Sequence, residues 1–271
     1  MSETDLMELG RARSFLFVPG DRPGRFSKAA AAGADMVVLD LEDAVAADNK
    51  RAAREHVGEW LSAEGRGVVR VRAADVPGHR GDVDSLVGLP GLQGVMLAKA
   101  ESPESVADVA ERTGVPVIPL VESAAGLACS EQMARARGSA RLAFGHLDMA
   151  ADIGSAPDRE PMLHARSTLV FASRLGGLPG PIDGVTTVLD SPEAVTSDVR
   201  YAHSLGMTGK LLIHPNQVEV SHAAMRPTAQ ELAWARSVTA TLGGGGVARV
   251  DDVMVDAPVL ARAEAILARF R

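Results

Sequence analysis

The sequence predicts a (β/α)8 barrel, or TIM barrel, followed by a C-terminal helical extension. Eight short apolar runs recur along the 271 residues at a mean spacing of about 28, close to the roughly 30 residues of one βαβ unit. Alanine-rich stretches with helical spacing lie between these runs, such as 25–33 and 104–114. Eight alternating units in a chain of this length favour a closed barrel, which we expect over residues 1–225, with the extension over 226–271.

Each expected strand is a short apolar run bounded by turn-forming or charged residues. The strands are expected at 14–18, 36–40, 68–72, 94–98, 116–121, 141–145, 184–188 and 210–214. Helices between them would stop at glycines such as Gly33 and Gly114. The main alternative is a doubly wound sheet, which normally carries a Gly-x-Gly-x-x-Gly turn after its first strand. The segment FVPGDRPGRF contains Gly20 and Gly24 but lacks that pattern, so the barrel is favoured.

The chain continues well past the eighth expected strand. Residues 228–242 have a helical pattern, and the glycines at 243–246 indicate a flexible break. The segment 259–270 then has the pattern of an amphipathic helix. A tail that follows a complete barrel must pack somewhere, so it could close the barrel face or reach a neighbouring subunit.

The composition is that of an ordinary globular protein and argues against several classes. The net charge of −7 and the absence of any run of basic residues argue against nucleic acid as a partner. Cys129 is the only cysteine, so intramolecular disulfides are impossible and a cysteine-based metal site is disfavoured. No window approaches the roughly 18 apolar residues of a membrane span, and the polar N-terminus lacks a signal-peptide core. We therefore expect a cytoplasmic protein without a membrane partner.

Ionisable side chains follow nearly every expected strand. Active sites in such barrels lie at the C-terminal ends of the strands, so these side chains should meet at one mouth. In strand order they are Asp21 and Arg22, then Asp40, Glu42 and Asp43, then Arg70 and Arg72, then Lys99 and Glu101, then Glu122, then His146 and Asp148, and finally His214. A random set of strand ends would be richer in Gly, Ser and Asn, so this convergence predicts a charged catalytic mouth.

Several carboxylates with no cysteine cluster and few histidines suit a hard cation bound through oxygen. Mg²⁺ prefers one or two carboxylates plus water and substrate oxygens, and Glu122 and Asp148 on adjacent strands could supply them. The carboxylates at 40–43 could hold the waters of the metal. Arg70 lies two residues from Arg72, so both should point to one face of their strand. A divalent metal beside an arginine can stabilise an enolate, which indicates breakage or formation of a C–C bond alpha to a carbonyl.

Purely structural interpretations remain open for most of these residues. The acids at 40–43 could simply cap the next helix, whose first turn favours negative charge. Arg72 could be the structural partner of one of these acids, and Lys99 and Glu101 could form an ion pair within a loop. Both His146 and His214 could be ordinary structural histidines. Glu122 is the hardest to explain this way, because it directly follows a fully apolar run.

Seven segments, taken in order, resemble one known family. They are FLFVPGDRPGRFSKAAAAGADMVVLDLEDAV, VVRV, VMLAKAES, PLVESAAGL, FGHLDMAADIG, IHPNQ and MVDAPV. The chain resembles the citrate lyase beta-subunit-like group of the HpcH/HpaI aldolase family from about residue 14 to its end. Each segment alone is weakly specific, whereas their order and spacing together are highly specific.

The resemblance implies a TIM barrel that assembles as a homotrimer or hexamer and cleaves or forms 3-hydroxyacyl-CoA thioesters with Mg²⁺. Glu122 and Asp148 resemble the magnesium ligands, and Arg70 resembles the substrate-binding arginine. Asp256 resembles an aspartate that a neighbouring subunit donates as acid or base. Glu42, with its neighbour at 43, would support catalysis by holding metal waters and Arg70.

The implied reaction gives acetyl-CoA, or a related acyl-CoA, and a 2-oxoacid. In it, a base takes the 3-hydroxyl proton and the C–C bond breaks to leave an acyl-CoA enolate, which is then protonated. The CoA phosphates would contact basic residues, for which the candidates are Arg22, Arg25, Lys28 and Lys99. The acyl group, the physiological direction and any partner subunits stay undetermined by the sequence.

Two departures from the family pattern and two alternative functions accompany this prediction. Ala98 stands where the family usually has proline, and Arg72 stands where an asparagine is common, which indicates a different substrate acid. The protein could instead be a pyruvate-type aldolase that acts on free hydroxy-oxoacids without CoA. It could also be a non-catalytic subunit of a citrate lyase complex, in which case Asp256 would be dispensable.

Overall fold

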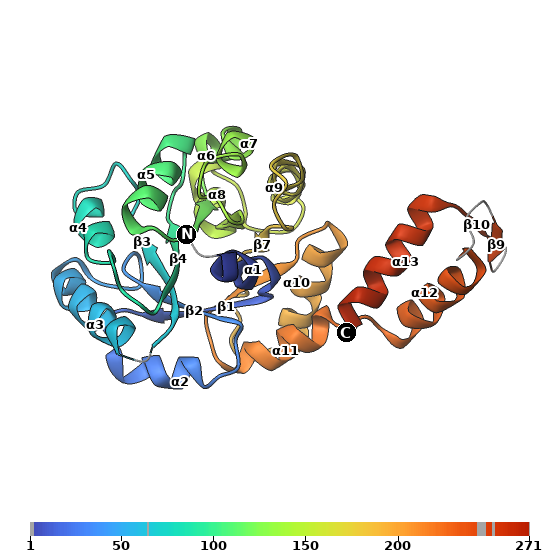
Figure 1. The fold of residues 1–271 in the computed structure, drawn as a ribbon, viewed down its shortest axis with the longest axis horizontal. Coiled ribbons are helices and arrows are strands. Elements are labelled where there is room, and N and C mark those ends of the chain that lie inside the picture. Colours follow the sequence, from blue (N-terminus) through green and yellow to red (C-terminus); the bar gives the residue numbers. More distant parts are fainter. Residues whose placement is uncertain (1–2, 64, 243–247, 251–252, 271) are drawn as a thin grey trace. The chain divides into compact units, whose positions relative to one another are not determined.

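Eight parallel strands close in sequence order into a barrel, β1 to β8, with helices around it (Figure 1). The computed structural model describes residues 3–63, 65–242, 248–250 and 253–270. The barrel strands are β1 (Ser14–Pro19), β2 (Met36–Asp40), β3 (Gly67–Val71), β4 (Leu92–Leu97), β5 (Val117–Val121), β6 (Ala143–Phe144), β7 (Ile182–Asp183) and β8 (Gly209–Leu212). The predicted barrel is therefore confirmed.

Helices connect each strand to the next, as parallel crossovers require, and a further helix lies before the first strand and another directly after the eighth. In the barrel they are α1 (Glu3–Arg11), η1 (Pro23–Arg25), α2 (Phe26–Ala30), η2 (Ala47–Asn49), α3 (Lys50–Ser62), α4 (His79–Asp84), α5 (Pro103–Thr113), α6 (Ala124–Ala128), α7 (Ser130–Ala134), α8 (His146–Ile153), α9 (Leu163–Leu175), α10 (Pro192–Ser204) and α11 (Asn216–Met225). Serine side chains cap three of these helices: Ser102 at α5, Ser123 at α6 and Ser191 at α10 accept from the N–H groups of Ser105, Gly126 and Ala194.

The side chains of the strands alternate between two cores. One core fills the barrel and includes Phe15, Val38, Val68, Leu120 and Leu211. The other, larger core lies between the strands and the helices and includes their sequence neighbours on the same strands. Because the direction repeats every second residue, Asp40, Arg70 and Glu122 continue the inward series at the ends of β2, β3 and β5. The alternation thus aims all three at the barrel axis.

One expected strand was placed wrongly. The run 184–188 has strand-like β-branched residues, but the seventh strand is Ile182–Asp183 and the run itself is irregular. Its partners β6 and β8 pair with this strand only at Ile182 and Asp183, so the later residues have no ladder to join. The other seven expected strands each overlap an observed one, although the sixth is shorter than the expected 141–145.

The chain divides into two compact units, Met1–Ser221 and His222–Arg271. The second unit contains α12 (Ala229–Leu242), an antiparallel pair of short strands, β9 (Ala248–Val250) and β10 (Val253–Val255), and α13 (Ala257–Phe270). Its own buried apolar cluster is formed by Leu232, Ala235, Val238, Val255, Ala263 and Ile266. The glycine break expected at 243–246 falls outside the described residues.

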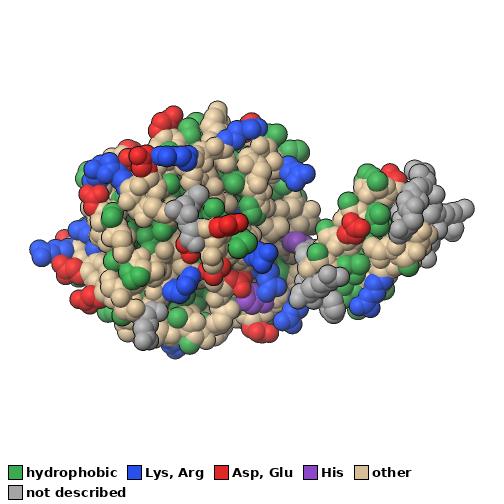
Figure 2. Space-filling model, viewed as in Figure 1, with side chains coloured by type: hydrophobic (Ala, Val, Ile, Leu, Met, Phe, Trp, Pro, Cys, Tyr) green, Lys and Arg blue, Asp and Glu red, His purple; other side chains and the backbone are tan. Residues whose placement is uncertain are grey.

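The surface in Figure 2 mixes both signs of charge. Acidic and basic side chains are interspersed over the visible face of the barrel unit and do not gather into a basic track there. Among the described residues, no helix combines the length and the apolar character needed to cross a bilayer.

Candidate active site

Arg70 is held rigidly across the β2–β3 ladder. Asp40 and Arg70 are paired in register, and the guanidinium donates from Nε to Asp40 Oδ1 at 2.8 Å and from Nη2 to Oδ2 at 2.6 Å. Asp40 also accepts from the backbone N–H groups of Glu42 at 2.8 Å and Ala44 at 3.0 Å. Asp40 therefore orients the arginine and the loop after β2, and its oxygens are fully engaged.

Glu42 and Asp43 complete the acidic surroundings of this arginine. Arg70 Nη1 lies 3.2 Å from Glu42 Oε2 and 3.8 Å from Asp43 Oδ2, and the guanidinium stacks over Phe17 at 4.8 Å from the ring centre. Burial lowers the pKa of Arg70, but the bonds and charges of Asp40 and Glu42 outweigh it and leave the pKa raised. Arg70 therefore stays charged at the barrel mouth.

The pKa of Glu42 is raised to about 7. Burial is the largest cause, and its hydrogen bond with Asp43 adds to it, whereas the charge of Arg70 acts in the opposite direction. Lys50 Nζ donates to the carbonyls of Leu41 at 2.8 Å and Glu42 at 2.5 Å and so fixes the loop that carries these acids.

Glu122 follows β5 and is only 3% exposed. Its Oε1 accepts the backbone N–H of Lys99 at 2.8 Å, across the neighbouring β4 strand end. Lys99 has φ of 45°, the one described residue other than glycine with positive φ. This backbone turn presents the N–H to the carboxylate, because an extended residue would direct it along the ladder.

Burial raises the pKa of Glu122 to about 8. The hydrogen bond from Lys99 lowers it, and the negative charge of Asp148 raises it again. The two carboxylates therefore repel each other in the protein alone. A cation bound between them would remove that repulsion, as expected for a metal site.

Gly145 makes room for Glu122. A Cβ atom at Gly145 would lie 2.2 Å from Glu122 Oε2 and 2.6 Å from Glu122 Cβ. Such contacts are too short for any side chain, so the position of this carboxylate depends on a glycine at the end of β6. Nothing in the sequence pattern alone marked Gly145 as part of the site.

Asp148 lies in the first turn of α8, half-buried, and faces the same cavity as Glu122 and Arg70. This cavity of about 230 Å³ is lined by Phe17, Asp40, Asp43, Ala44, Arg70, Leu120, Glu122, Phe144, Gly145, His146, Leu147, Asp148, Val185, Leu211 and Ile213. The structure thus brings together the arginine and both carboxylates that the strand-end argument selected. Phe17 and Phe144, which give the cavity its apolar walls, were not foreseen.

The donor set suits magnesium better than zinc. No group of three or more His, Cys, Asp or Glu side chains with metal-binding geometry occurs among the described residues. Two carboxylates leave most coordination positions for water and substrate oxygens, which is the arrangement that Mg²⁺ favours. Glu122 and Asp148 therefore fit this ion by chemistry and by their mutual repulsion.

Lys99 lies among the acids of the mouth. Burial lowers the pKa of Lys99, but the charges of Glu42, Asp43, Asp148 and Glu122 outweigh it and leave the pKa raised. The alternative interpretation, a loop ion pair between Lys99 and Glu101, does not hold between these two described residues, because Glu101 accepts instead from the Ser123 hydroxyl at 2.5 Å. A role in binding CoA phosphates stays a prediction for Lys99.

The other expected phosphate contacts are exposed and follow β1. Arg22 directly precedes η1, Arg25 is its last residue, and Lys28 lies in α2. Arg22 pairs with Asp21 at 3.6 Å. These three cations share one connecting segment, and their assignment to CoA stays a prediction.

Arg72 is engaged away from Arg70. It donates from Nε and Nη2 to both oxygens of the fully buried Asp82, at 2.7 and 2.8 Å, and to the carbonyls of Pro77 and Gly78. The structural interpretation of Arg72 is thus favoured, with Asp82 rather than an acid of 40–43 as its partner.

Asp256 belongs to the second unit and directly precedes α13. Its carboxylate accepts the N–H of Val259 at 3.3 Å, as a helix cap does. The proposed role as a neighbour's acid or base is untested by this contact and stays a prediction.

A closed eight-stranded α/β barrel whose mouth presents an arginine and two carboxylates defines the class of the protein. The model of the HpcH/HpaI aldolase/citrate lyase family matches residues 13–215. The chain belongs to this family.

Individual relatives cover nearly the whole chain. The citrate lyase subunit beta-like protein of Mycobacterium tuberculosis (strain CDC 1551 / Oshkosh) is 37% identical over 94% of both chains. The (3S)-malyl-CoA thioesterase of Cereibacter sphaeroides (strain ATCC 17025 / ATH 2.4.3) is 30% identical over 94% of this chain and 96% of its own. The crystal structure of CitE from M. tuberculosis in complex with magnesium, acetoacetate and coenzyme A has a TM-score of 0.88 at 36% identity, with 96% of this chain and 98% of that chain covered.

Proposed function

We propose that the protein is a Mg²⁺-dependent carbon–carbon lyase that acts on a 3-hydroxyacyl-CoA thioester and releases an acyl-CoA and a 2-oxoacid. The observation that carries the proposal is the convergence of Arg70, Glu122 and Asp148 on one cavity at the barrel mouth. The related CitE structure with magnesium, acetoacetate and coenzyme A supports the choice of ion and substrate class. The reverse reaction, a condensation, uses the same groups.

Glu122 and Asp148 would hold the ion. When bound, Mg²⁺ would polarise the substrate oxygens and stabilise negative charge that develops on them. Glu122 Oε1 accepts the Lys99 N–H, which leaves Oε2, beside Gly145, as the oxygen that would bind the ion.

Arg70 would stabilise the negative charge that develops on the thioester oxygen during cleavage. A base takes the proton of the C3 hydroxyl group, and its oxygen forms the carbonyl group of the 2-oxoacid. The C2–C3 bond breaks, and its electrons form the acyl-CoA enolate, whose negative charge lies on the thioester oxygen. The enolate then takes up a proton at C2. Asp40 holds the guanidinium in place beforehand, so little reorganisation accompanies the charge. Glu42 would position Arg70 from its other side.

Asp256 from a neighbouring subunit would act as the acid or base that moves a proton to or from the substrate. The assembly would be a cytoplasmic homotrimer or hexamer. Coexpression of two inactive variants, Glu122→Gln and Asp256→Ala, tests this. Mixed oligomers would contain sites with an intact barrel from one chain and an intact Asp256 from the other, so part of the activity returns. If Asp256 served its own barrel, every site would keep one defect and the mixture would stay inactive.

The direct test of the proposed function is a cleavage assay with citryl-, malyl- and citramalyl-CoA, with and without Mg²⁺. Mass spectrometry of the products should detect acetyl-CoA and the matching 2-oxoacid, only with Mg²⁺ and not with the Glu122→Gln variant. Free CoA with an intact hydroxyacid would instead indicate a thioesterase, the activity named for the C. sphaeroides relative.

The two remaining alternatives give different outcomes in the same assay. Cleavage of free hydroxy-oxoacids without CoA binding would favour a pyruvate-type aldolase. Inactivity on the whole panel would favour a non-catalytic subunit of a citrate lyase complex.

A further inference from the structure

A second cavity lies on the outer side of the barrel wall, against the ends of β6, β7 and β8. Its volume is about 550 Å³, within the range of small-molecule sites. Ile182 and Leu211 belong to the core inside the barrel, so their neighbours Asp183 and Lys210 point outward, toward the helices. This cavity shares only His146, Leu147 and Val185 with the catalytic one.

The floor of the outer cavity carries a buried excess of positive charge. Asp183 accepts from Arg166 Nε at 2.8 Å and from Lys210 Nζ at 2.9 Å. All three residues are buried: Asp183 and Lys210 are 1% exposed, and Arg166 is 6% exposed. Within this group of three, two cations against one carboxylate leave one net positive charge, which is costly to bury without a compensating anion. Asp198 also lines the cavity, but it is half-buried and pairs with Arg159.

Polar nitrogens beside this floor have no protein partner in the described part of the chain. Arg166 Nη1 and His146 Nδ1 are both buried and make no hydrogen bond there. Lys210 donates once to Asp183, although an ammonium carries three N–H groups. Both Arg166 and His146 are more than nine-tenths buried and line the cavity. Arg166 Nη1 and the two spare N–H groups of Lys210 are therefore available as donors for an anion, and His146 Nδ1 adds a third in the tautomer that carries its proton there.

The walls and the rim restrict the kind of anion. Leu147, Pro157, Val185 and Val188 supply apolar wall surface. The exposed carboxylates of Asp158 and Glu160 stand on the rim and would repel a multiply charged ligand. The cavity suits one negative charge attached to a short apolar body.

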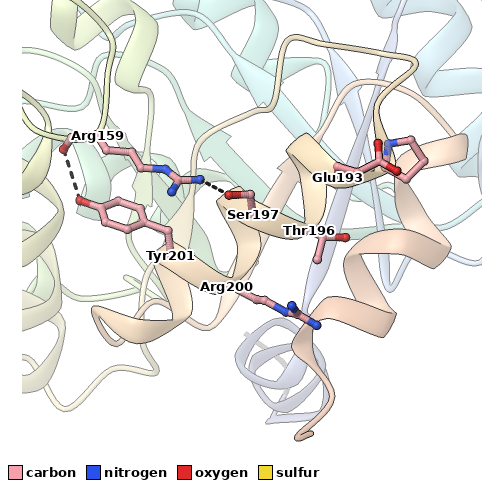
Figure 3. A pocket seen from close by; sticks show the side chains of 7 residues that line it. Arg159, Glu193, Thr196, Ser197, Arg200 and Tyr201 are labelled. Carbon is pink, nitrogen blue, oxygen red and sulfur yellow. Dashed lines mark hydrogen bonds between the residues drawn. The ribbon is translucent and has the colours of Figure 1, made fainter.

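Arg159 closes one side of the cavity and is not free to join the floor. It donates to Asp198 on α10 at 3.0 Å. It also donates to Ser197 at 2.7 Å, and the Tyr201 hydroxyl donates back to the Arg159 carbonyl; Figure 3 draws these two contacts in a neighbouring pocket that Arg159 also lines. The loop between α8 and α9 is pinned to α10 by these contacts. The anion must therefore be recognised by the buried floor.

We propose that this outer cavity is a second ligand site that binds a small monocarboxylic acid, with its carboxylate on Lys210 and Arg166 and its apolar body against Leu147 and Val185. The site is separate from the proposed lyase reaction and does not depend on it. One ion pair and a short apolar contact correspond to a dissociation constant of about 1 mM.

Ligand-observed NMR titration with butyrate, without Mg²⁺, tests the site. Lys210→Met should weaken butyrate binding at least about tenfold, while Asp183 keeps Arg166 as its partner. Ala194→Leu fills the cavity without changing a charge and should weaken binding similarly, which covers a failure of the first variant to fold. Arg200→Met, on the exposed side of the same helix, is the matched control and should bind as the wild type does.

The neutral analogue butyramide and inorganic phosphate complete the experiment. Butyrate should bind in preference to both, and it should still bind the Arg70→Lys variant, whose change lies in the catalytic cavity. Wild-type affinity in both Lys210→Met and Ala194→Leu would overturn the proposal, as would equal binding of butyramide, preference for phosphate, or loss of binding in Arg70→Lys alone.

Discussion

Arg70, half-buried, and Arg141, fully buried, are two arginines at opposite ends of the barrel. Arg70, at the C-terminal mouth, binds carboxylates and has a raised pKa. Arg141, at the N-terminal end and fully buried, donates to the carbonyls of Leu9, Ala12 and Gly180 and to the Thr208 hydroxyl. Burial lowers its pKa to about 10.

The difference separates function from stability. The partners of Arg141 lie in the segments that precede β1, β7 and β8, so this residue holds the N-terminal ends of these strands together. The partners of Arg70 are acids of one loop, and its remaining surface faces a cavity. The division agrees with the general pattern of such barrels, in which the C-terminal face reacts and the N-terminal face stabilises.

Arg70→Lys should produce the largest effect on activity. Lysine keeps the charge but loses the fork that Asp40 holds, so we expect cleavage to fall by about 10²- to 10³-fold. The measurement is kcat/KM for the best thioester of the panel, with Tm as the control. A loss of less than threefold would remove Arg70 from the reaction.

Arg141→Lys should show the opposite pattern. A lysine cannot reach three carbonyls and a hydroxyl at once, so we expect the free energy of unfolding to fall by about 3 kcal/mol. Activity per folded molecule should stay at the wild-type value. Denaturant unfolding measures the first and an assay at low temperature the second. Unchanged stability would contradict the role of Arg141 at the base.

Gly145→Ala tests how the mouth holds its metal. The new methyl group would push Glu122 away from its position, so the affinity for Mg²⁺ should fall by about 10- to 100-fold. Calorimetric titration of Mg²⁺ measures it. Gly58→Ala is the matched control, because a Cβ there meets no atom within 4 Å. Equal affinities in the two variants would show that Glu122 does not depend on this space.

The affinity for Mg²⁺ should also depend on pH. Because the pKa of Glu122 is about 8 without metal, Mg²⁺ must displace a proton below that pH. Affinity should therefore rise about tenfold per pH unit up to pH 8 and then level off. Titrations in buffers of different ionisation enthalpy would detect the released proton. A flat profile from pH 6 to 9 would exclude Glu122 as the titrating ligand.

The same pKa bears on stability without metal. The folded-state pKa of Glu122 lies above its ordinary value of 4.5, so the folded protein binds the proton more tightly than the unfolded chain does. The metal-free protein should therefore lose stability as pH rises from about 4.5 to 8. Glu42, with a pKa of about 7, acts in the same direction.

The regular spacing of the apolar runs predicted the barrel. The residues at the ends of the expected strands predicted that Arg70, Glu122 and Asp148 converge. Both arguments use only the alternation of side chains and the common direction of parallel strands. The run 184–188 failed because strand propensity says nothing of whether a neighbour is available to pair with. The Asp40–Arg70 pair required the β2–β3 register, which no local pattern contains.

Neither the space that Gly145 leaves for Glu122 nor the outer cavity could be predicted from the sequence. The absence of a side chain at Gly145 matters only because another strand places a carboxylate there. The floor of the outer cavity combines residues from α9, β7 and β8, and each looked unremarkable in its own segment.

The backbone of Lys99 has a consequence for the order of folding. Its N–H reaches Glu122 only when β4 lies beside β5, and Arg70 reaches Asp40 only when β3 lies beside β2. Each contact closes a loop of more than 20 residues, so neither can form before its strands meet. Such non-local closure is slow compared with helix formation. The mouth should thus appear late in refolding, and Mg²⁺ uptake would report the closed barrel rather than its early helices.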